Sequence, residues 1–437
     1  MKFSAQCAAV EELLGEFLET LEKPADLLVR KYLIERRYIG SHDRQRITSI
    51  FYGVLRNYFR LRFILKLDNL PPLPRWLILS YFIDIEKMTV LELEENFKIS
   101  SKYGWQNLTE KHITFLKSIS KNLRKMEKKD TLPIEFEYGV SNDILDVFKK
   151  NLPDKIAEEV LHTLKKEAPI DIRVNPLKQN RDALLQLLHS EKWDCSPTPL
   201  SPLGIRLKKR YPITASKWFK EGLVEIQDEG AQILSFLGVP KTTGKILDYC
   251  AGAGGKSLLI GALMKNKGRL VLTDTSERRL KEAAKRCKRA GLSNHTIKYL
   301  NTNKSWIKRQ KKSFDIVLAD VPCSGTGTWR RHVDAKLRFS QEILDQLVLK
   351  QRDILEKASL LVKPGGMLIY ATCSVLKKEN EEQVKFFLEQ NSSFKLIPAK
   401  DNLPLELPPI YFDKSYLKIL PKHNECDGFF AAVMKKN

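Results

Sequence analysis

The chain has 437 residues, enough for two or three domains with sizeable cores. Its 75 lysines and arginines outnumber its 53 aspartates and glutamates, which gives a formal net charge of +22 at pH 7. Such a basic balance favours a polyanionic partner. No apolar run reaches the roughly 18 residues that a membrane-spanning helix needs, so we expect no transmembrane helix.

Seven cysteines are scattered along the chain, and none belongs to a CxxC pair. This odd and dispersed set fits neither a disulfide framework nor a zinc site, so we expect no metal. Free thiols are usual in a reducing compartment. The first residues carry Glu11, Glu12 and Glu16 and no long apolar stretch, which argues against a signal peptide. We therefore expect a cytoplasmic protein.

Residues 1–130 are predicted to form an all-helical domain. Apolar residues recur at helical spacing from Ile47 to Ile64, with Asp43 as the expected N-cap of one helix. The segment 71–74 (PPLP) ends that helix. The apolar segment 76–83 is too short to cross a membrane and is predicted to be a buried helix.

Residues 131–225 are predicted to form a small α+β domain, because helical patterns alternate there with short extended pieces such as 170–174. The run 206–210 (RLKKR) is followed by Tyr211. A basic run beside an aromatic residue suits a surface that follows an RNA backbone.

Residues 226–437 are predicted to form a Rossmann-like α/β domain. Strands are expected at 245–248, 269–273, 315–319, 366–370 and 429–434, and helices at 256–264, 277–290, 341–361 and 379–388. This alternation implies βαβ units with right-handed crossovers and a mostly parallel sheet.

A glycine-rich loop, 248–256 (DYCAGAGGK), follows the first of these strands. Its glycines let the backbone approach a ligand and bring amide groups to a helix N-terminus. Asp274 follows Asp248 by 26 residues, at the end of the next strand, where an acid can bind ribose hydroxyls. A nicotinamide dinucleotide and S-adenosylmethionine would both suit this layout.

Two cysteines follow predicted strands, Cys323 in 322–327 (PCSGTG) and Cys373 in 371–374 (ATCS). Ligands bind at the carboxyl ends of parallel strands, so we expect both thiols in one cleft. Thiols have no use in hydride transfer, the glycine spacing is not GxGxxG, and Asp248 can meet the amino acid end of S-adenosylmethionine. These three details favour S-adenosylmethionine.

Two thiols suit the activation of a pyrimidine ring. Addition of a thiolate to C6 of cytosine makes C5 an enamine-type nucleophile, and the second thiol can assist release. Protonation at N3 helps the addition, and Asp320 is placed to supply it. Arg330 and Arg331 follow the first thiol motif, where they would lower a thiol pKa or hold phosphate.

From about residue 170 onward the chain resembles the RNA cytosine-5 methyltransferases of the Sun/Fmu and nucleolar-protein type. The matching segments are 173–175 (RVN), 227–232 (QDEGAQ), the glycine loop, 320–327 (DVPCSGTG), 330–331 (RR), 372–374 (TCS), 379–381 (ENE) and 427–430 (DGFF). The segments 42–44 (HDR) and 52–57 (YGVLRN) resemble the NusB-like RNA-binding domain. That domain is fused to bacterial members of the RsmB/Sun type, which modify small-subunit ribosomal RNA.

The resemblance implies a role for each matching position. Cys373 matches the nucleophile, Cys323 the cysteine linked to product release, and Asp320 the carboxylate that contacts the cytosine. The implied cofactor residues for S-adenosylmethionine are Ala251, Gly252, Ala253, Gly254, Gly255, Lys256, Asp274, Arg278, Asn301 and Asp320.

Three positions depart from the family pattern. The usual loop reads CAAPGGK, but Gly252 and Ala253 replace its second alanine and its proline, which frees the loop. Asn301 replaces the acid after the third strand and can still accept a hydrogen bond from the adenine amino group. Val333 stands where proline is usual and can shift Asp334.

The expected reaction is methylation of C5 of a cytidine in small-subunit (16S) ribosomal RNA by a monomeric enzyme. The target base must leave its stack to reach the thiol. Three alternatives stay open: a transfer RNA cytosine-5 methyltransferase, a non-catalytic RNA-binding or ribosome assembly factor, and a DNA cytosine-5 methyltransferase. The last is disfavoured because those enzymes take the nucleophile from the Pro-Cys motif and lack the Thr-Cys-Ser one.

Overall fold

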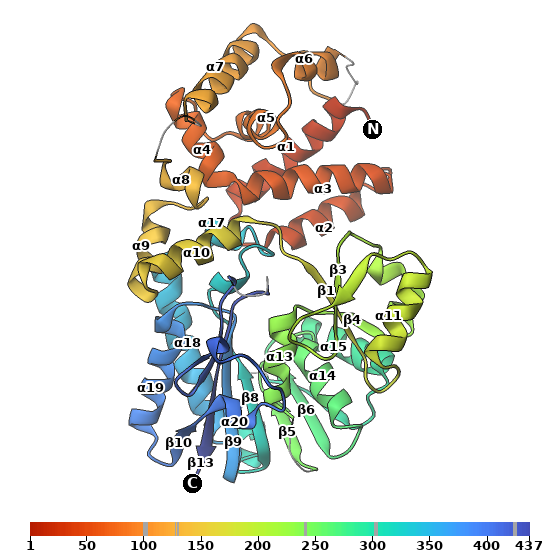
Figure 1. The fold of residues 1–437 in the computed structure, drawn as a ribbon, viewed down its shortest axis with the longest axis vertical. Helices are drawn as coiled ribbons and strands as arrows, with labels where there is room; N and C mark the ends of the chain where they lie inside the picture. The colour runs from red at the N-terminus through yellow and green to blue at the C-terminus, as the bar shows by residue number, and fades with distance from the viewer. Residues whose placement is uncertain (99–103, 127, 129–130, 240–242, 301–304, 423–425) are drawn as a thin grey trace. The chain divides into compact units, whose positions relative to one another are not determined.

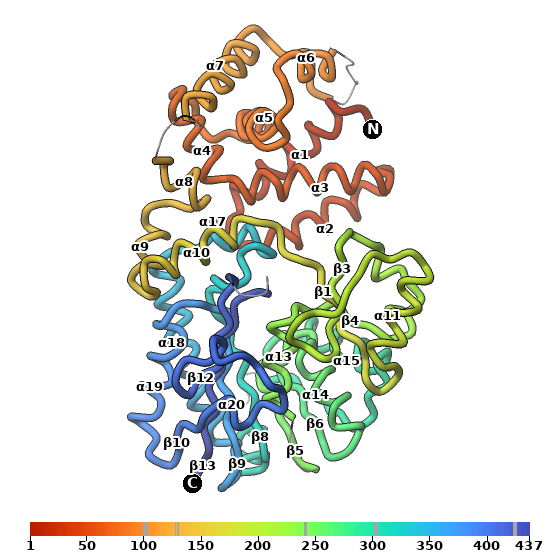
Figure 2. Tube along the Cα trace, in the orientation of Figure 1, coloured from red at the N-terminus to blue at the C-terminus, as the bar shows by residue number. Residues whose placement is uncertain are grey.

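The computed structural model describes residues 1–98, 104–126, 128, 131–239, 243–300, 305–422 and 426–437. The chain forms two compact units, drawn in Figure 1 and traced in Figure 2. Residues 1–166 and 329–339 make the helical unit, and residues 167–328 and 340–437 make the sheet unit. In the part of the chain that the structure describes, no helix is both long and apolar enough to span a membrane.

The helical unit contains eleven α-helices among its described residues. They are α1 (Phe3–Glu19), α2 (Ala25–Glu35), α3 (Ser41–Arg56), α4 (Tyr58–Leu67), α5 (Pro74–Asp84), α6 (Val90–Lys98), α7 (Glu110–Met126), α8 (Ile134–Glu137), α9 (Asn142–Asn151), α10 (Asp154–Lys165) and α17 (Ala335–Arg338). Helices α8–α10, which we predict to open the small α+β domain, thus lie in the helical unit.

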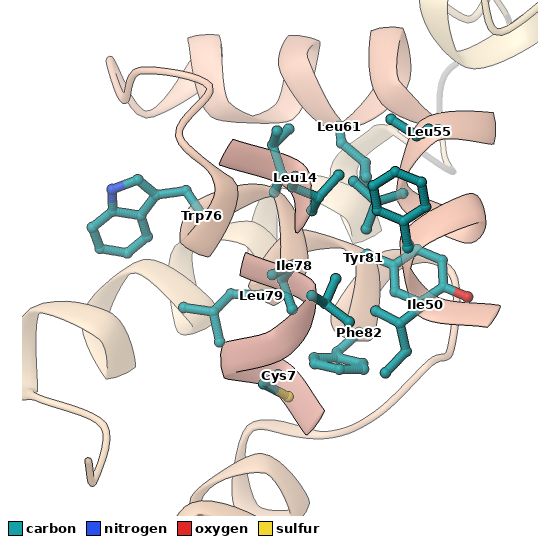
Figure 3. Close-up of a cluster of buried hydrophobic side chains, with 14 of the residues drawn as sticks. Cys7, Leu14, Ile50, Leu55, Leu61, Trp76, Ile78, Leu79, Tyr81 and Phe82 are labelled. Carbon is teal, nitrogen blue, oxygen red and sulfur yellow. The ribbon is translucent and has the colours of Figure 1, made fainter. Parts of the chain in front are cut away.

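The core of the helical unit is built around α5. Every residue from 76 to 84 is buried, as expected for a helix that is apolar on all sides. Figure 3 shows its side chains Ile78, Tyr81 and Phe82 among apolar residues of neighbouring helices, such as Leu14 and Ile50. The predicted buried helix is therefore confirmed.

The prediction of a single helix from Asp43 to Ile64 is wrong in two respects. The chain breaks at Asn57, between α3 and α4, where the Asn57 side chain donates to the Gly53 carbonyl at 2.9 Å. The N-cap of α3 is Gly40 and not Asp43. The Asp43 carboxylate instead accepts from Gln6 Nε2 at 2.8 Å, so a tertiary contact uses the side chain that local capping rules assign to the helix end.

The segment 329–339 leaves the sheet unit and completes the helical unit. Trp329, only 2% exposed, lies with its ring centroid 5.6 Å from that of Phe148. Val333 joins the apolar core. Lys336 is buried, and its Nζ donates to the carbonyls of Arg56 and Gly139 at 2.5 and 3.1 Å. The helical unit is therefore not formed by the N-terminal residues alone.

Asp334 in this segment caps α2 from a distance. Its Oδ2 accepts from the backbone N of Ala25, the first residue of α2, at 3.2 Å. Pro24, the N-cap by position, offers no side-chain cap. We expect Asp334→Ala to lower the free energy of unfolding by about 1 kcal/mol, measured by urea titration. Asp334→Asn keeps a hydrogen-bond acceptor and should therefore retain most of this free energy of unfolding. Equal losses in both variants would contradict the capping role.

The sheet unit begins with a small antiparallel sheet. Its strands are β1 (Ile170–Val174), β2 (Cys195–Pro197), β3 (Gly204–Leu207) and β4 (Val224–Ile226), in the order β2-β3-β1-β4. Helices α11 (Arg181–Ser190) and α12 (Lys217–Lys220) and the short turn η1 (Ile213–Ala215) complete this part. Alternate residues of the strands, such as Ile172 and Ile205, form one apolar core with α11.

A larger sheet follows, with nine strands among the described residues. They are β5 (Lys245–Asp248), β6 (Arg269–Asp274), β7 (His295–Tyr299), β8 (Phe314–Asp320), β9 (Val362–Thr372), β10 (Phe394–Ile397), β11 (Phe412–Asp413), β12 (Tyr416–Ile419, labelled in Figure 2) and β13 (Phe429–Lys436). The order is β11-β12-β13-β9-β8-β5-β6-β7, and β10 pairs with β13. Strands β7, β6, β5, β8 and β9 are parallel, while β13 runs antiparallel to β9.

Helices cover both faces of the large sheet (Figure 1). They are α13 (Glu229–Leu237), α14 (Gly255–Leu263), α15 (Glu277–Ala290), α16 (Ser305–Arg309), α18 (Gln341–Ser359), α19 (Glu381–Gln390) and α20 (Ala399–Asn402), with the short turns η2 (Thr326–Thr328), η3 (Lys377–Glu379) and η4 (Pro409–Tyr411). Ile246 and Leu270 pack with α13–α15, whereas their neighbours Leu247 and Val271 pack with α18 and α19. This alternation follows from the period of two in a strand, so a run that is apolar throughout is buried on both faces.

The strand order reverses beside β5. After β5 the chain builds β6 and β7 on one side and then returns to build β8 on the other. In open α/β sheets, ligands bind at such a switch point, outside the carboxyl ends of the strands. The crevice at the ends of β5 and β8 is therefore the expected binding site.

Candidate active site

The glycine loop between β5 and α14 has the conformation of a ligand cradle. Gly252 and Gly254 have φ angles of +56° and +82°, in the left-handed region that favours glycine. A Cβ added at Gly252 or Gly255 would meet no described atom within 4 Å, so the backbone there is open to an approaching group. Gly254 is the N-cap of α14, which directs helical amides towards the same region.

Two carboxylates lie at the strand ends next to this loop. Asp274, at the end of β6, accepts from the backbone N of Gly252 at 2.9 Å and of Ser276 at 2.7 Å. Asp248, at the end of β5, accepts from Ser257 Oγ at 2.5 Å through Oδ2, while its buried Oδ1 has no hydrogen-bond partner among the described residues. A buried acceptor that lacks a partner fits the amino group of a bound cofactor.

Burial raises the pKa of Asp248 to about 7, and the nearby Asp320 adds to this effect, whereas the Ser257 hydroxyl opposes it. Because the folded-state pKa exceeds the unfolded value, this residue makes stability fall as the pH rises from about 4 to 7. Asp248→Asn removes the titration. We expect the unfolding free energy of the variant, relative to that of the original chain, to increase by up to about 4 kcal/mol between pH 4 and pH 8.

Urea titrations of both proteins without cofactor across this pH range measure the difference. The amide introduced by Asp248→Asn keeps an acceptor for the Ser257 hydroxyl, so the packing around the side chain is preserved. A difference that does not change with pH would contradict the raised pKa.

Lys256 and Asp320 form an ion pair across the switch point. Lys256 Nζ, on the first turn of α14, donates to Asp320 Oδ2, at the end of β8, at 2.5 Å. Burial lowers the pKa of Lys256, but the Asp320 carboxylate more than offsets this, and Cys373 and Asp248 act in the same direction as Asp320, so the pKa lies above its usual value. Lys256 is thus a charged group shared by the glycine loop and the thiol site.

The two predicted thiols lie together. Cys323 Sγ and Cys373 Sγ are 3.4 Å apart. Asp320 in β8 lies opposite Ala371 in β9, so the turns that follow the two strands start at the same level of the sheet. The hydrogen bond to Cys373 and burial raise the pKa of Cys323 well above its usual value. The two thiols are therefore within hydrogen-bond distance of each other, and either sulfur can be the donor.

Neighbouring residues Glu379 and Asn380 hold the two thiol turns. The Glu379 carboxylate accepts from the backbone N of Ser324, beside Cys323, at 2.8 Å, and from the Ser324 hydroxyl. Asn380 accepts from the Thr372 hydroxyl at 2.6 Å and donates to the Ser374 carbonyl at 2.9 Å. Both residues are buried.

Sequence reasoning assigned no role to this pair. The only signal was the match of 379–381 to a family segment. Gln351, from α18, donates to Glu379 Oε1 at 2.9 Å and to the Pro322 carbonyl at 3.1 Å. It therefore connects Glu379 to the first thiol turn.

Four other predicted residues, Arg278, Asn301, Arg330 and Arg331, are not part of the contacts given above. Arg278 is exposed on the first turn of α15, and Asn301 lies outside the described residues. Arg330 and Arg331 lie in the segment that completes the helical unit. No group of three or more His, Cys, Asp and Glu side chains within the described ranges is arranged to hold a metal ion.

The basic run 206–210 is not one continuous RNA-facing surface. The Arg206 side chain is only 15% exposed, and its Nε donates to Asp171 Oδ1 at 2.8 Å. Successive residues of β3 point to opposite faces of the sheet. Arg206 therefore points away from the face on which Leu207 is buried in the apolar core. Tyr211 stacks on Trp193 with ring centroids 4.3 Å apart.

The chain is similar to proteins of known families. A family model described as 16S rRNA methyltransferase RsmB/F matches residues 236–435, and one described as an RsmF/B-like methyltransferase, ferredoxin-like domain, matches residues 144–214. The "Probable ribosomal RNA small subunit methyltransferase B" of Bacillus subtilis is 28% identical, covering 100% of this chain and 99% of the relative. The ribosomal RNA small subunit methyltransferase B of Photorhabdus laumondii is 30% identical, covering 91% and 92%. The crystal structure of PH0851 superposes with a TM-score of 0.76 at 25% identity, covering 99% and 98%.

Proposed function

The chain belongs to the 16S rRNA methyltransferase RsmB/F family and is an S-adenosylmethionine-dependent RNA methyltransferase, and from this premise we propose that it methylates C5 of a cytidine in small-subunit (16S) ribosomal RNA. The observation that carries the proposal is the pair of sulfur atoms, 3.4 Å apart, beside the Lys256–Asp320 ion pair. A thiol can serve as the nucleophile that attacks C6 of a pyrimidine, and a second thiol near the same sulfur can assist release of the product.

The glycine loop supports a site for S-adenosylmethionine, which supplies the methyl group when bound. The open backbone at Gly252 and Gly255 suits its methionine end. The unpartnered Oδ1 of Asp248 suits its amino group, and Asp274 lies where an acid binds ribose hydroxyls. Ala251, Ala253 and Gly254 shape the rest of the loop, and Arg278 and Asn301 complete the proposed set.

Cys373 is the proposed nucleophile because it stands at the position of the nucleophile in the family pattern, and the Cys323 sulfur, 3.4 Å away, is placed to assist release. The Cys373 sulfur, once it has lost its proton, forms a bond with C6 as the C5–C6 π bond opens into the ring, and Asp320, held by Lys256, assists protonation at N3. After methylation of C5, a base removes the C5 proton and the C6–S bond breaks. The departing sulfur keeps its electron pair and accepts the hydrogen bond of the Cys323 thiol.

The remaining parts of the chain serve the RNA. We assign residues 1–130 to a NusB-like RNA-binding domain, 131–225 to a small α+β RNA-binding or linker domain, and 226–437 to the methyltransferase domain, except that α8–α10 and segment 329–339 pack within the helical unit. The net charge of +22 supports a polyanionic substrate. The target cytidine leaves its stack to reach Cys373. The enzyme is proposed to act as a cytoplasmic monomer.

The deciding experiment is methyl transfer from labelled S-adenosylmethionine to unmodified 16S ribosomal RNA, followed by digestion to nucleosides. The expected product is labelled 5-methylcytidine. Unmodified transfer RNA and DNA of matched length serve as competing substrates. Label only in transfer RNA would favour that substrate. Cofactor binding without label in any nucleic acid would favour a binding or assembly factor.

A further inference from the structure

The small sheet presents a charged face to the rest of the sheet unit. Arg173 in β1 and Glu225 in β4 lie opposite each other in the antiparallel register. Both are buried, with only 2% and 3% of their surfaces exposed. Buried charges need partners, and the partners here come from the glycine loop and from α15.

Two arginines donate to the backbone of the glycine loop. Arg173 Nη1 donates to the carbonyl of Gly255 at 3.1 Å and to Gln227 Oε1. Arg286 Nη1, from α15, donates to the carbonyl of Ala253 at 2.9 Å. These carbonyls lie on both sides of Gly254, so the two guanidinium groups fix the orientation of the peptide planes where the loop enters α14.

Glu225 is the counter-ion of two arginines on α15, Arg286 and Arg289. Its Oε2 accepts from Arg286 Nη2 at 3.0 Å, and its Oε1 accepts from Arg289. Arg289 extends in the other direction, with its guanidinium 4.0 Å from the centroid of the Phe219 ring. Burial lowers the pKa of Arg173 to about 10, with Glu225 opposing this effect, so Arg173 stays charged at neutral pH.

The loop of this chain has a particular need for such support. Gly252 and Ala253 stand where the family pattern has alanine and proline. Glycine loses more conformational freedom on ordering than any other residue, and the missing proline no longer restricts φ. Hydrogen bonds from the charged Arg173 and Arg286 are directional and stronger than neutral ones, so they restrict the loop where the proline is missing.

We propose that Arg173 and Arg286 are positioning residues that preorganise the loop 251–256 for S-adenosylmethionine, with Glu225 as the counter-ion of Arg286. The small sheet thereby forms part of the cofactor site. This inference rests on the proposed placement of the cofactor at the glycine loop.

Calorimetric titration of the full chain with S-adenosylmethionine tests the proposal. Arg286→Met should raise the Kd by roughly tenfold, because a charged hydrogen bond to the loop is lost. Arg289→Met is the matched control: it removes an arginine from the same helix and the same carboxylate, and the Kd should stay within about twofold. With RNA, Arg286→Met should raise the KM for S-adenosylmethionine and leave kcat at saturating cofactor and the KM for RNA unchanged.

A second variant distinguishes weaker cofactor binding from misfolding. Arg286→Lys keeps a cation beside Glu225 but cannot reach both partners with a fork, so it should fold and still bind the cofactor more weakly. The proposal is overturned if Arg286→Lys binds as tightly as the original chain, or if Arg289→Met weakens binding as much as Arg286→Met. An original chain that binds no S-adenosylmethionine at all overturns the proposed function instead.

Discussion

Cys373→Ala is expected to lower methyl transfer to 16S ribosomal RNA by a factor on the order of 10³ or more. Without the sulfur, C6 of the target ring has no covalent partner and C5 stays a poor nucleophile. Single-turnover incorporation of labelled methyl groups measures the loss. Cofactor binding should persist, because the glycine loop does not depend on the Cys373 side chain.

Cys195→Ala is the matched control for this variant. Cys195 is a buried cysteine in β2, within the apolar core of the small sheet. Cys195→Ala should lower the free energy of unfolding, but its rate constant for methyl transfer should equal that of the original chain. A Cys373→Ala protein that stays active would refute the assigned nucleophile, and complete loss of the first methyl transfer on Cys323→Ala alone would point to the DNA type of mechanism.

Cys323→Ala is expected to reduce turnover by about 10²-fold or more while still allowing the first methyl transfer. The Cys323 Sγ lies 3.4 Å from the Cys373 Sγ, so removal of the Cys323 thiol deprives the departing sulfur of a hydrogen-bond partner at the release step. RNA should therefore stay covalently attached to the protein, visible as a slow band on a denaturing gel.

One control and two contrary outcomes define this result. The double variant with Cys373→Ala should show no attached RNA, because no C6–S bond forms. Normal turnover by Cys323→Ala would show that release needs no second thiol. Loss of activity without any attached RNA would show that Cys323 acts before bond formation.

The local pattern of residues was enough to predict the buried strands of the large sheet and several of the helices that cover it. The predicted strand 245–248 and helix 277–290 match β5 and α15 residue for residue. Continuous apolar runs mark strands buried on both faces, and Ser276 and Gly291 cap α15 at its two ends. These signals are contained in neighbouring residues.

Other elements gave no such signal. Strand β7 is polar and half-exposed at the sheet edge, so neither alternation nor an apolar run marked it. The antiparallel additions β10–β12 are short and depend on pairing with β13 or with each other. The break at Asn57 interrupts an apolar pattern that continues on both sides of it.

By itself the sequence determined which chemistry the chain carries: a glycine loop after one strand, and a thiol in the turn after each of two others. These features are local, because a strand followed by a turn is encoded by consecutive residues. Only the tertiary structure decided that the two thiols lie 3.4 Å apart, that 329–339 completes the helical unit, and that Arg173 and Arg286 reach the cofactor loop. Such contacts depend on sheet register and on packing between residues far apart in the chain, where burial and charge pairing outweigh local preference.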